Sequence, residues 1–334
     1  MRRLQNGKIP IDILDRAVLR FGGSSSAEVM VGPEAGVDVA VLKHGDGFVV
    51  VSTDPITGAS EDIGTYAVRV CANDVATSGN APQFATSVVL LQEGATEADL
   101  TAITKQIHEA AADSGIAVLG GHTEVTPGLA RPIVVMTVFA FTERYVTSAD
   151  ARAWDTILMT KTAGIEGTSE LAREKTLSKV VPQATLRRAR ALIGNLDVTP
   201  EAIAAFRTGA VHAMHDCTEG GVLGAVYEMS LASGLGFNLI EEAVPVSPET
   251  REICDRLSVD PLRLIGSGAL LIAVAPGSEA TVARALKGIC RVTKIGEFAP
   301  KGKKLLRRDG TAQVVRKAPE DELWRVLSRR GRRV

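Results

Sequence analysis

Apolar and polar positions along residues 1–150 follow the patterns of short strands and amphipathic helices. Strands show a period of two or a continuous apolar run, and helices show apolar positions three and four residues apart. An Asp-Gly dipeptide between two apolar runs predicts a β-hairpin, and Thr96 with Asp99 predicts a capped helix start. The predicted elements are a hairpin over 41–54, a helix over 61–78, a strand over 83–91, a helix from 96 to 115, a strand from 116 into a turn at Gly120 and Gly121, and a strand over 131–142.

The pattern restarts after residue 150 and again alternates strands with helices. Such alternation favours an α/β (α+β) fold in which helices cover a sheet. We therefore predict domains at 1–150 and 151–316, followed by a helix and a basic tail at 317–334. The predicted elements are strands from 156 and over 211–216, 236–246, 269–276 and 291–299, and helices from 168 and over 182–196, 220–234, 247–259, 278–290 and 319–330.

Composition supports two cores of ordinary size. The 334 residues are 45% hydrophobic but only 4% aromatic and include 32 glycines, which suits tightly turned α/β layers. A net charge of −1 gives no field to attract nucleic acid or an anionic membrane. Basic residues gather near the ends, which we interpret as a solvated tail, with a docking arm as the alternative. They include Arg2, Arg3, Arg329, Arg330, Arg332 and Arg333.

Cysteine usage and the absence of a secretory leader or a long apolar run predict a cytoplasmic protein with reduced thiols. None of the four cysteines forms a C-x-x-C pair. Cys217 is interpreted as a buried thiol, with a nucleophile as the alternative. His212 and His215 are three apart in a predicted strand, so they point to opposite faces and do not form a zinc pair.

Acidic residues are set at the ends of apolar runs. Asp38, Asp54 and the pair Asn73-Asp74 each follow or interrupt such a run. Carboxylates that converge where strands end and helices begin hold Mg²⁺ and the phosphates that it carries. Each aspartate taken alone is also explained by a turn or a helix cap. The ordered set favours an enzyme that uses Mg²⁺ and ATP.

Two glycine-bearing turns are candidate anion sites. Lys161 precedes a loop over 164–168 at a predicted helix start, where backbone N–H groups can face an anion. A second turn opens the helix over 220–234, with turn chemistry as the alternative explanation for both. Its candidate cofactor-binding residues are Asp216, Thr218, Gly220 and Gly221.

Taken in order, these motifs resemble the AIR synthase (PurM) superfamily over roughly residues 7–300, and most closely its HypE branch of hydrogenase maturation factors. The resemblance rests on the ordered set, and no Walker loop occurs. The motifs are GVDVAVL, VVVSTD, CANDVATSGNAP, VLGGHTEV, HAMHDCTEGGVLGAVYEMSLASG and IGSGALLIAV.

The resemblance implies a PurM-like architecture. An N-terminal β-sheet domain would form a barrel with its twin in a homodimer, and ATP would lie between it and a C-terminal α/β domain. Asp54, Asp74 and His122 match catalytic positions. The implied cofactor-binding residues are Asp38, Asp54, Asn73, Asp74, Gly120, Gly121, Thr123 and Lys161, together with Asp216, Thr218, Gly220 and Gly221 of the second glycine-bearing turn. The implied metal ligands are Asp38, Asp54, Asp74 and Glu124.

Three departures from the family pattern stand out. His122 occupies a position that carries a carboxylate in several relatives, so Glu124 is the alternative ligand. Glu219 stands where HypE-like sequences commonly have arginine. No cysteine follows Cys290, whereas HypE ends in a cysteine that accepts a carbamoyl group.

The sequence therefore predicts a Mg²⁺-dependent enzyme that transfers phosphate from ATP to an unidentified acceptor. One alternative is a HypE-type maturation factor that dehydrates a carbamoyl group and works with a partner protein. The other is a regulator or assembly subunit that binds ATP without turning it over.

Overall fold

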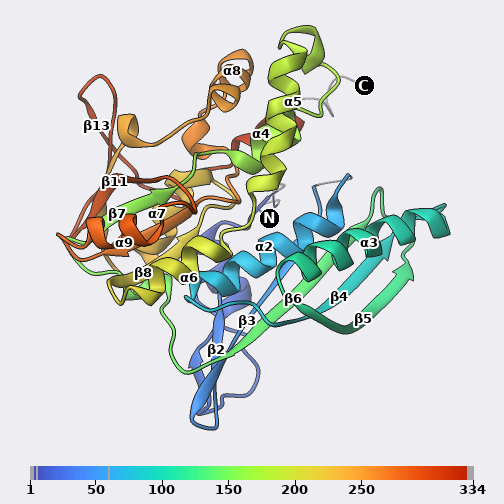
Figure 1. Cartoon of the computed structure of the whole chain (residues 1–334), viewed down its shortest axis with the longest axis horizontal. Coiled ribbons are helices and arrows are strands. Elements are labelled where there is room, and N and C mark those ends of the chain that lie inside the picture. The colour runs from blue at the N-terminus through green and yellow to red at the C-terminus, as the bar shows by residue number, and fades with distance from the viewer. Residues whose placement is uncertain (1–3, 5–6, 59–60, 329–334) are drawn as a thin grey trace.

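Two sheets, each with helices packed on it, form the protein (Figure 1). The computed structural model describes residue 4 and residues 7–58 and 61–328, so the basic residues at 2–3 and 329–334 lie outside it. The first sheet and its helices are α1 (Ile11–Leu14), the π-turn η1 (Asp15–Leu19), β1 (Val29–Val31), β2 (Ala40–His44), β3 (Gly47–Ile56), α2 (Ile63–Thr77), β4 (Phe84–Leu91), α3 (Glu97–Asp113), β5 (Ala117–Val125) and β6 (Ile133–Thr142).

The second sheet and its helices follow in the chain. They are β7 (Thr156–Thr160), α4 (Ile165–Leu171), α5 (Gln183–Ala191), α6 (Thr199–Arg207), β8 (Val211–Asp216), α7 (Gly221–Ala232), β9 (Gly236–Ile240), α8 (Pro248–Leu257), β10 (Leu270–Val274), α9 (Glu279–Ala285), β11 (Val292–Ala299), β12 (Lys303–Leu306), β13 (Ala312–Val314) and α10 (Glu322–Ser328). The predicted α/β fold is confirmed.

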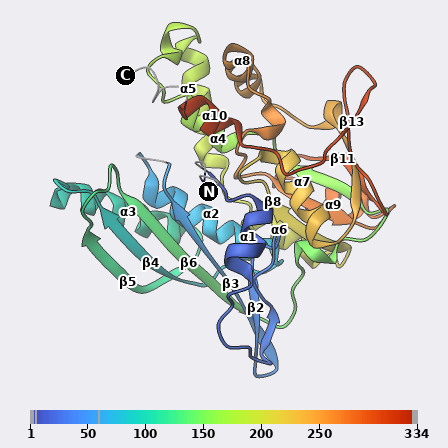
Figure 2. The ribbon, with the colours of Figure 1, turned by 180° about the vertical axis from the view of Figure 1, so that it is seen from behind.

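The first sheet is open and has the order β1-β2-β3-β6-β4-β5. Only β4 and β5 pair in parallel, because α3 connects them as a crossover. Helices α2 and α3 cover one face, where alternate strand residues such as Val50, Val89 and Met136 are buried. Over β4, β5 and β6 the opposite face carries no helix of the described chain, and Figure 2 shows these strands in front of α2 and α3. At β3, Leu19 of η1 lines a hollow together with Val51 and Thr53.

The turn predicted at Gly120 and Gly121 is wrong, because β5 continues through both glycines. They have φ values of +146° and +156° beside an irregularity in the pairing of β4 with β5. A Cβ atom on Gly121 would lie 1.7 Å from the backbone oxygen of Ser87. Glycine is therefore required here for close strand approach rather than for a turn.

The second sheet has the order β13-β12-β9-β11-β7-β10-β8, and only β9 with β12 is parallel. Its strands β7 and β10 are completely buried between helices. The sequence patterns missed α6, β12 and β13, although Pro200 near the start of α6 is a recognised helix signal. None of the helices in the described residues has the length and apolarity needed to cross a bilayer.

The C-terminal helix α10 packs back onto the second half of the chain. Leu323 and Val326 are buried in a cluster that includes Leu171, Ile253 and Leu264. Figure 2 shows α10 beside α4, on the side of the molecule where the N-terminal segment also lies. This packing places residues at both ends of the described chain close to the junction of the two sheets.

Candidate functional site

Four aspartates from four separate segments meet at the junction of the two halves. Asp38 precedes β2, Asp54 lies near the end of β3, Asp74 lies on α2 and Asp216 ends β8. The carboxyls of Asp54 and Asp74 are within hydrogen-bonding reach of each other, and the Ser52 hydroxyl donates to Asp74 Oδ2 at 2.6 Å. The structure thus brings together Asp38, Asp54 and Asp74, as predicted from their motifs, and places with them Asp216, which was predicted as a cofactor-binding residue but not as a metal ligand.

Burial and mutual repulsion raise the pKa values of three of these carboxyls. Burial is the largest cause for Asp54, Asp74 and Asp216. The neighbouring aspartates add to it, since the Asp54 charge raises the pKa of Asp74 and the Asp38 charge raises the pKa of Asp216. Without a cation, these groups therefore hold protons at a pH where exposed carboxyls are ionised.

The donor set fits a hard divalent cation such as Mg²⁺. Asp216 is fully buried, and neither of its carboxylate oxygens has a hydrogen-bond partner in the described residues. One carboxylate oxygen of Asp38 and one of Asp216 lie within 4.8 Å of each other. Oxygen ligands that lack protein partners and repel one another are stabilised by a bound cation.

Three further residues, which the sequence patterns did not single out as site residues, support this cluster. The His215 ring donates through Nδ1 to Asp38 Oδ2 at 2.6 Å and through Nε2 to Glu228 Oε2 at 3.1 Å. Lys8 Nζ donates to Glu228 at 2.6 Å. The available signals were the position of His215 directly before Asp216 and a single carboxylate, Glu228, within the apolar helix α7.

The charges of these three residues are mutually dependent. Burial alone would lower the pKa of His215, but Asp38 and Glu228 raise it to about 10, so the ring is an imidazolium at neutral pH. Burial would raise the pKa of Glu228, but Lys8 and His215 lower it to about 2. Burial would likewise lower the pKa of Lys8, and Glu228 raises it above its usual value. The two cations therefore hold the Asp38 and Glu228 side chains in fixed positions and keep Glu228 ionised.

The turn before α7 is occupied by the chain itself. The N–H of Gly220, a predicted cofactor-binding group, donates to Asp321 Oδ2 at 2.7 Å. Gly221 is required because its Cβ would lie 2.6 Å from the backbone oxygen of Leu264. The carbonyl of Thr218 accepts from the N–H of Gly221. Asp216 of this predicted set faces the other aspartates, whereas the backbone of the turn binds the segment that leads into α10.

Glu219 ties both ends of the described chain to this turn. Its carboxylate accepts from the backbone N–H of Lys8 at 2.6 Å and from the indole N–H of Trp324 at 3.0 Å. The Trp324 ring also lies against Gly7 and Gly58. The acidic residue that departs from the HypE pattern thus accepts two donors from its own chain.

Residues 120–124, also predicted for the site, lie elsewhere in the chain. The pairing runs from Asp54 through Met136 and Ser87 to Gly121, so Asp54 and Gly121 are three strands apart, or about 14 Å. His122 pairs with Val88 on the open face of the sheet, whereas Asp54 faces α2. The His122 and Glu124 side chains contact each other at 3.0 Å. The structure does not bring them to the aspartates of the same chain.

Comparison with known proteins agrees with this geometry. Residues 36–142 match the N-terminal domain, and residues 155–307 the C-terminal domain, of AIR synthase related protein. Carbamoyl dehydratase HypE of Escherichia coli K12 is 31% identical over 250 residues, which cover 72% of this chain and 70% of that protein. The chain belongs to the AIR synthase-related family.

Solved structures share the fold of this AIR synthase-related chain. A HypE–HypF complex contains a chain with a TM-score of 0.74 and 21% identity, which covers 91% of this chain and 99% of that chain. HypE in complex with ATP gives a TM-score of 0.70 and 19% identity, with coverage of 94% of this chain and 93% of that chain. At these identities the likeness establishes the fold.

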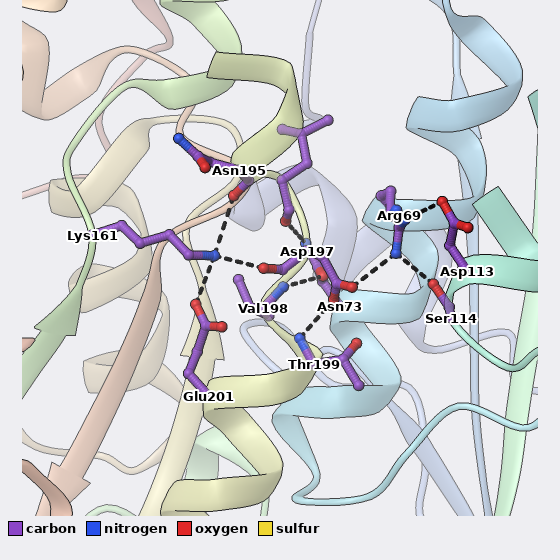
Figure 3. Close-up of polar contacts among 11 residues, drawn as sticks. Arg69, Asn73, Asp113, Ser114, Lys161, Asn195, Asp197, Val198, Thr199 and Glu201 are labelled. Carbon is purple, nitrogen blue, oxygen red and sulfur yellow. Dashed lines mark hydrogen bonds and ion pairs between the residues drawn. The ribbon is translucent and has the colours of Figure 1, made fainter. Parts of the chain in front are cut away.

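Asn73 and Lys161, two predicted cofactor-binding residues of the AIR synthase-related chain, both contact the segment that leads into α6, Asn73 from the first half of the chain and Lys161 from the second (Figure 3). The Asn73 amide donates to the carbonyl of Leu196 at 2.8 Å and accepts from the N–H of Val198 at 2.9 Å. Lys161 Nζ pairs with Glu201 at 2.7 Å and donates to the carbonyls of residues 195 and 197. Both side chains fix the segment that leads into α6, and the structure does not bring Lys161 to the aspartates.

Replacing Asn73 with alanine should destabilise this AIR synthase-related chain by about 3 kcal/mol, because a buried N–H and a buried carbonyl lose their partners. Denaturant unfolding measures the change, and Asn195→Ala, at an exposed position, is the control. ATP affinity of the folded variant should stay within threefold of the parent. A large loss of ATP affinity at unchanged stability would assign Asn73 to the nucleotide instead.

Proposed function

We propose that this protein is a Mg²⁺-dependent enzyme that transfers phosphate from ATP to an acceptor. The observation that supports it most is Asp216, whose two buried oxygens lack partners among the described residues while it faces Asp38, Asp54 and Asp74. A structural cluster would pair these oxygens with protein donors. The solved complex of a HypE with ATP, in the same fold, supports ATP as the nucleotide.

The aspartates would hold Mg²⁺, which would supply positive charge to offset the charge that develops on the phosphate during transfer. The contacts of His215 and Lys8 fix Asp38 and Glu228 in place, so the ligands need little rearrangement on binding. Ser52 orients Asp74 through its hydroxyl hydrogen bond. Together these contacts preorganise the carboxylates.

Calorimetric titration with ATP, with and without Mg²⁺, tests the proposal when followed by an ADP-release assay on the same sample. Binding that requires Mg²⁺, with slow release of ADP, is the expected result. Binding without any turnover would favour a regulator that only binds ATP. No binding under either condition would refute the nucleotide site.

A role in hydrogenase maturation is a second candidate. It is favoured by the identity with E. coli HypE and by the shared fold of a HypE–HypF complex. Co-purification with a HypF-type carbamoyltransferase, followed by an assay for ATP-dependent dehydration of a carbamoyl group, would support it. Loss of the interaction in a surface variant of either protein would serve as the control.

We also propose that the open face of the first sheet forms a homodimer. It carries apolar side chains that no described helix covers, among them Val135 and Phe139, and β5 leaves Leu119 and Val125 exposed. An uncovered apolar sheet face beside an edge strand is a typical association surface. Any role of His122 and Glu124 at the nucleotide depends on this contact, because within one chain their side chains lie on the other face from Asp54.

Val135→Glu should convert the dimer to a monomer, because it buries a charge without a partner in the proposed interface. Light scattering after size exclusion measures the mass, which for the parent should be twice the 35.2 kDa of one chain. Val180→Glu, at a valine that is 52% exposed in the second half of the chain, should leave the parent mass unchanged. A monomeric parent would refute the dimer.

A further inference from the structure

A continuous series of hydrogen bonds links the C-terminal helix α10 to the aspartate cluster. The indole N–H of Trp324 donates to Glu219 Oε1 at 3.0 Å, and Glu219 Oε2 accepts from the backbone N–H of Lys8 at 2.6 Å. Lys8 Nζ donates to Glu228 Oε1 at 2.6 Å. His215 then joins Glu228 Oε2 to Asp38 Oδ2. This contact chain consists of Trp324, Glu219, Lys8, Glu228, His215 and Asp38.

Lys8 is the link of the contact chain that packing does not fix. The residue is exposed, although its ammonium group reaches the buried carboxylate of Glu228. A long, exposed side chain loses rotamer freedom when it is held in one geometry, so an ion pair at such a residue needs a fixed starting point. The contact of Glu219 with the backbone N–H of Lys8 supplies that starting point.

Glu219 and Trp324 themselves stand on a fixed frame. Asp321 Oδ2 accepts from the N–H of Gly220 at 2.7 Å, so the segment that leads into α10 is bound to the turn that carries Glu219. The helix itself packs into the core of the second half of the chain. The Trp324 ring lies so close to Gly7 that a Cβ atom there would be 2.8 Å from its Cδ1 atom. The N-terminal segment is therefore held against this frame directly before Lys8.

The inner part of the contact chain is buried. Glu228 and His215 are 6% and 2% exposed. Hydrogen bonds between charged groups in such surroundings are strong and directional. Glu228 uses one carboxylate oxygen for Lys8 and the other for His215, so a shift of the ammonium group changes the carboxylate that orients the imidazole ring. The ring in turn holds Asp38, which has an oxygen within 4.8 Å of one on Asp216.

We propose that Glu219 and Trp324 are positioning residues for the Mg²⁺ ligand Asp38. Trp324 fixes the Glu219 carboxylate, and Glu219 fixes the backbone of Lys8. The rest of the contact chain carries this placement to Asp38, so α10 contributes to metal affinity without supplying a ligand. The role of Asp38 as a Mg²⁺ ligand rests on the proposed function, but the coupling of Trp324 to His215 does not.

Trp324→Phe tests the proposal because it removes the indole N–H but keeps an aromatic ring and every charge. Mn²⁺ is the probe, since it takes the same kinds of oxygen ligand as Mg²⁺ and its free form is counted by EPR spectroscopy. The variant of the full chain should bind Mn²⁺ about fivefold more weakly than the parent. Trp154→Phe, at a tryptophan that is 57% exposed, is the matched control and should leave the Mn²⁺ affinity unchanged.

Lys8→Met decides whether Trp324 acts through the contact chain. Methionine lacks the ammonium group, so the contact with Glu228 is lost at an exposed residue, and Mn²⁺ binding should weaken by about tenfold. In this background Trp324→Phe or Glu219→Gln should weaken Mn²⁺ binding by less than about a further twofold. An equal loss from Trp324→Phe in both backgrounds, or no loss in the parent background, would overturn the proposal. Thermal unfolding checks that each variant is folded.

The His215 ring gives a readout that needs no metal ion. Its ring nitrogen NMR signals, assigned by their absence in His215→Gln, should shift in Trp324→Phe and stay in place in Trp154→Phe. The signals of His108, at an exposed position on α3, should stay in place in both variants. A tryptophan that only stabilises the fold would lower the unfolding temperature without moving the His215 signals or the Mn²⁺ affinity.

The two readouts separate this proposal from the proposed function. If the parent binds Mn²⁺ but neither the Mn²⁺ affinity nor the His215 signals respond to Trp324→Phe, the positioning role fails while the metal site stands. If the parent does not bind Mn²⁺ but the His215 signals respond, the coupling of Trp324 to His215 stands while the Mg²⁺-dependent function fails.

Discussion

Asp74→Asn is expected to weaken the binding of ATP with Mg²⁺ by about a hundredfold or more, which corresponds to about 3 kcal/mol. Asp74 is buried beside Asp54, and its charge is needed only when a cation is present. Asparagine keeps the volume and can still accept from Ser52, but it cannot supply the negative charge. Calorimetric titration measures the loss.

The ligand-free variant should be at least as stable as the parent. In the parent, burial and the neighbouring aspartates oppose ionisation of Asp74, so removal of the charge relieves repulsion. Thermal unfolding without ligand checks this, and Asp46→Asn in the exposed hairpin turn is the control for both measurements. Unchanged ATP affinity in Asp74→Asn would exclude Asp74 as a ligand, and a collapse in stability would show a structural role.

The second large effect concerns pH. The ligand-free protein should lose stability as pH rises from 6 to 9, and Mg²⁺ should stabilise it more at pH 8 than at pH 6. Asp54, Asp74 and Asp216 have raised pKa values in the folded state, and the pKa of Asp321 is raised to about 7 by burial. Each such group makes the folded chain bind more protons than the unfolded chain.

The sign follows from this excess of bound protons. A group whose pKa is higher in the folded state than in the unfolded state contributes its full stabilisation at pH values below its unfolded-state pKa. This stabilisation is lost as the pH rises through the folded-state pKa. Each such proton changes the free energy of unfolding by about 1.4 kcal/mol per pH unit inside its window. The imidazolium of His215, with a pKa of about 10, acts in the same direction.

Mg²⁺ has the opposite dependence because it must displace these protons, which costs more at lower pH. Unfolding temperatures measured at pH 6, 7, 8 and 9, with and without Mg²⁺, give both trends. Asp74→Asn should show a shallower decline than the parent. A stabilisation by Mg²⁺ that does not vary with pH would contradict the proposed site.

Local sequence signals predicted helices and strands well where the contacts that define them are between residues close in sequence. The capping box of Thr96 and Asp99 starts α3, and the hairpin between β2 and β3 turns at the Asp-Gly dipeptide. The ordered motifs also located Asp38, Asp54 and Asp74, because strand ends and buried helix faces are readable from apolar spacing. These features depend on neighbours within a few residues.

Features that depend on distant segments were not predictable in the same way. Paired glycines usually indicate a turn, but Gly121 is needed because the backbone of Ser87 on the neighbouring strand leaves no room for a Cβ atom. Asn73 looked like a polar site residue, although its partners are backbone groups of residues 196 and 198. The Asp321 carboxylate accepts a hydrogen bond from the N–H of Gly220, which is 101 residues away in the chain, and no local sequence pattern predicts that contact.

The junction at Glu219 bears on how the protein is made. Its partners lie 211 residues before it, at Lys8, and 105 residues after it, at Trp324. Domains generally fold in order as a chain leaves the ribosome, so the first sheet can fold while Asp216 is still unsynthesised. Asp38, Asp54 and Asp74 would then face water, with their charges screened. We therefore expect a nascent chain that ends before Asp216 to lack one carboxylate of the proposed Mg²⁺ site.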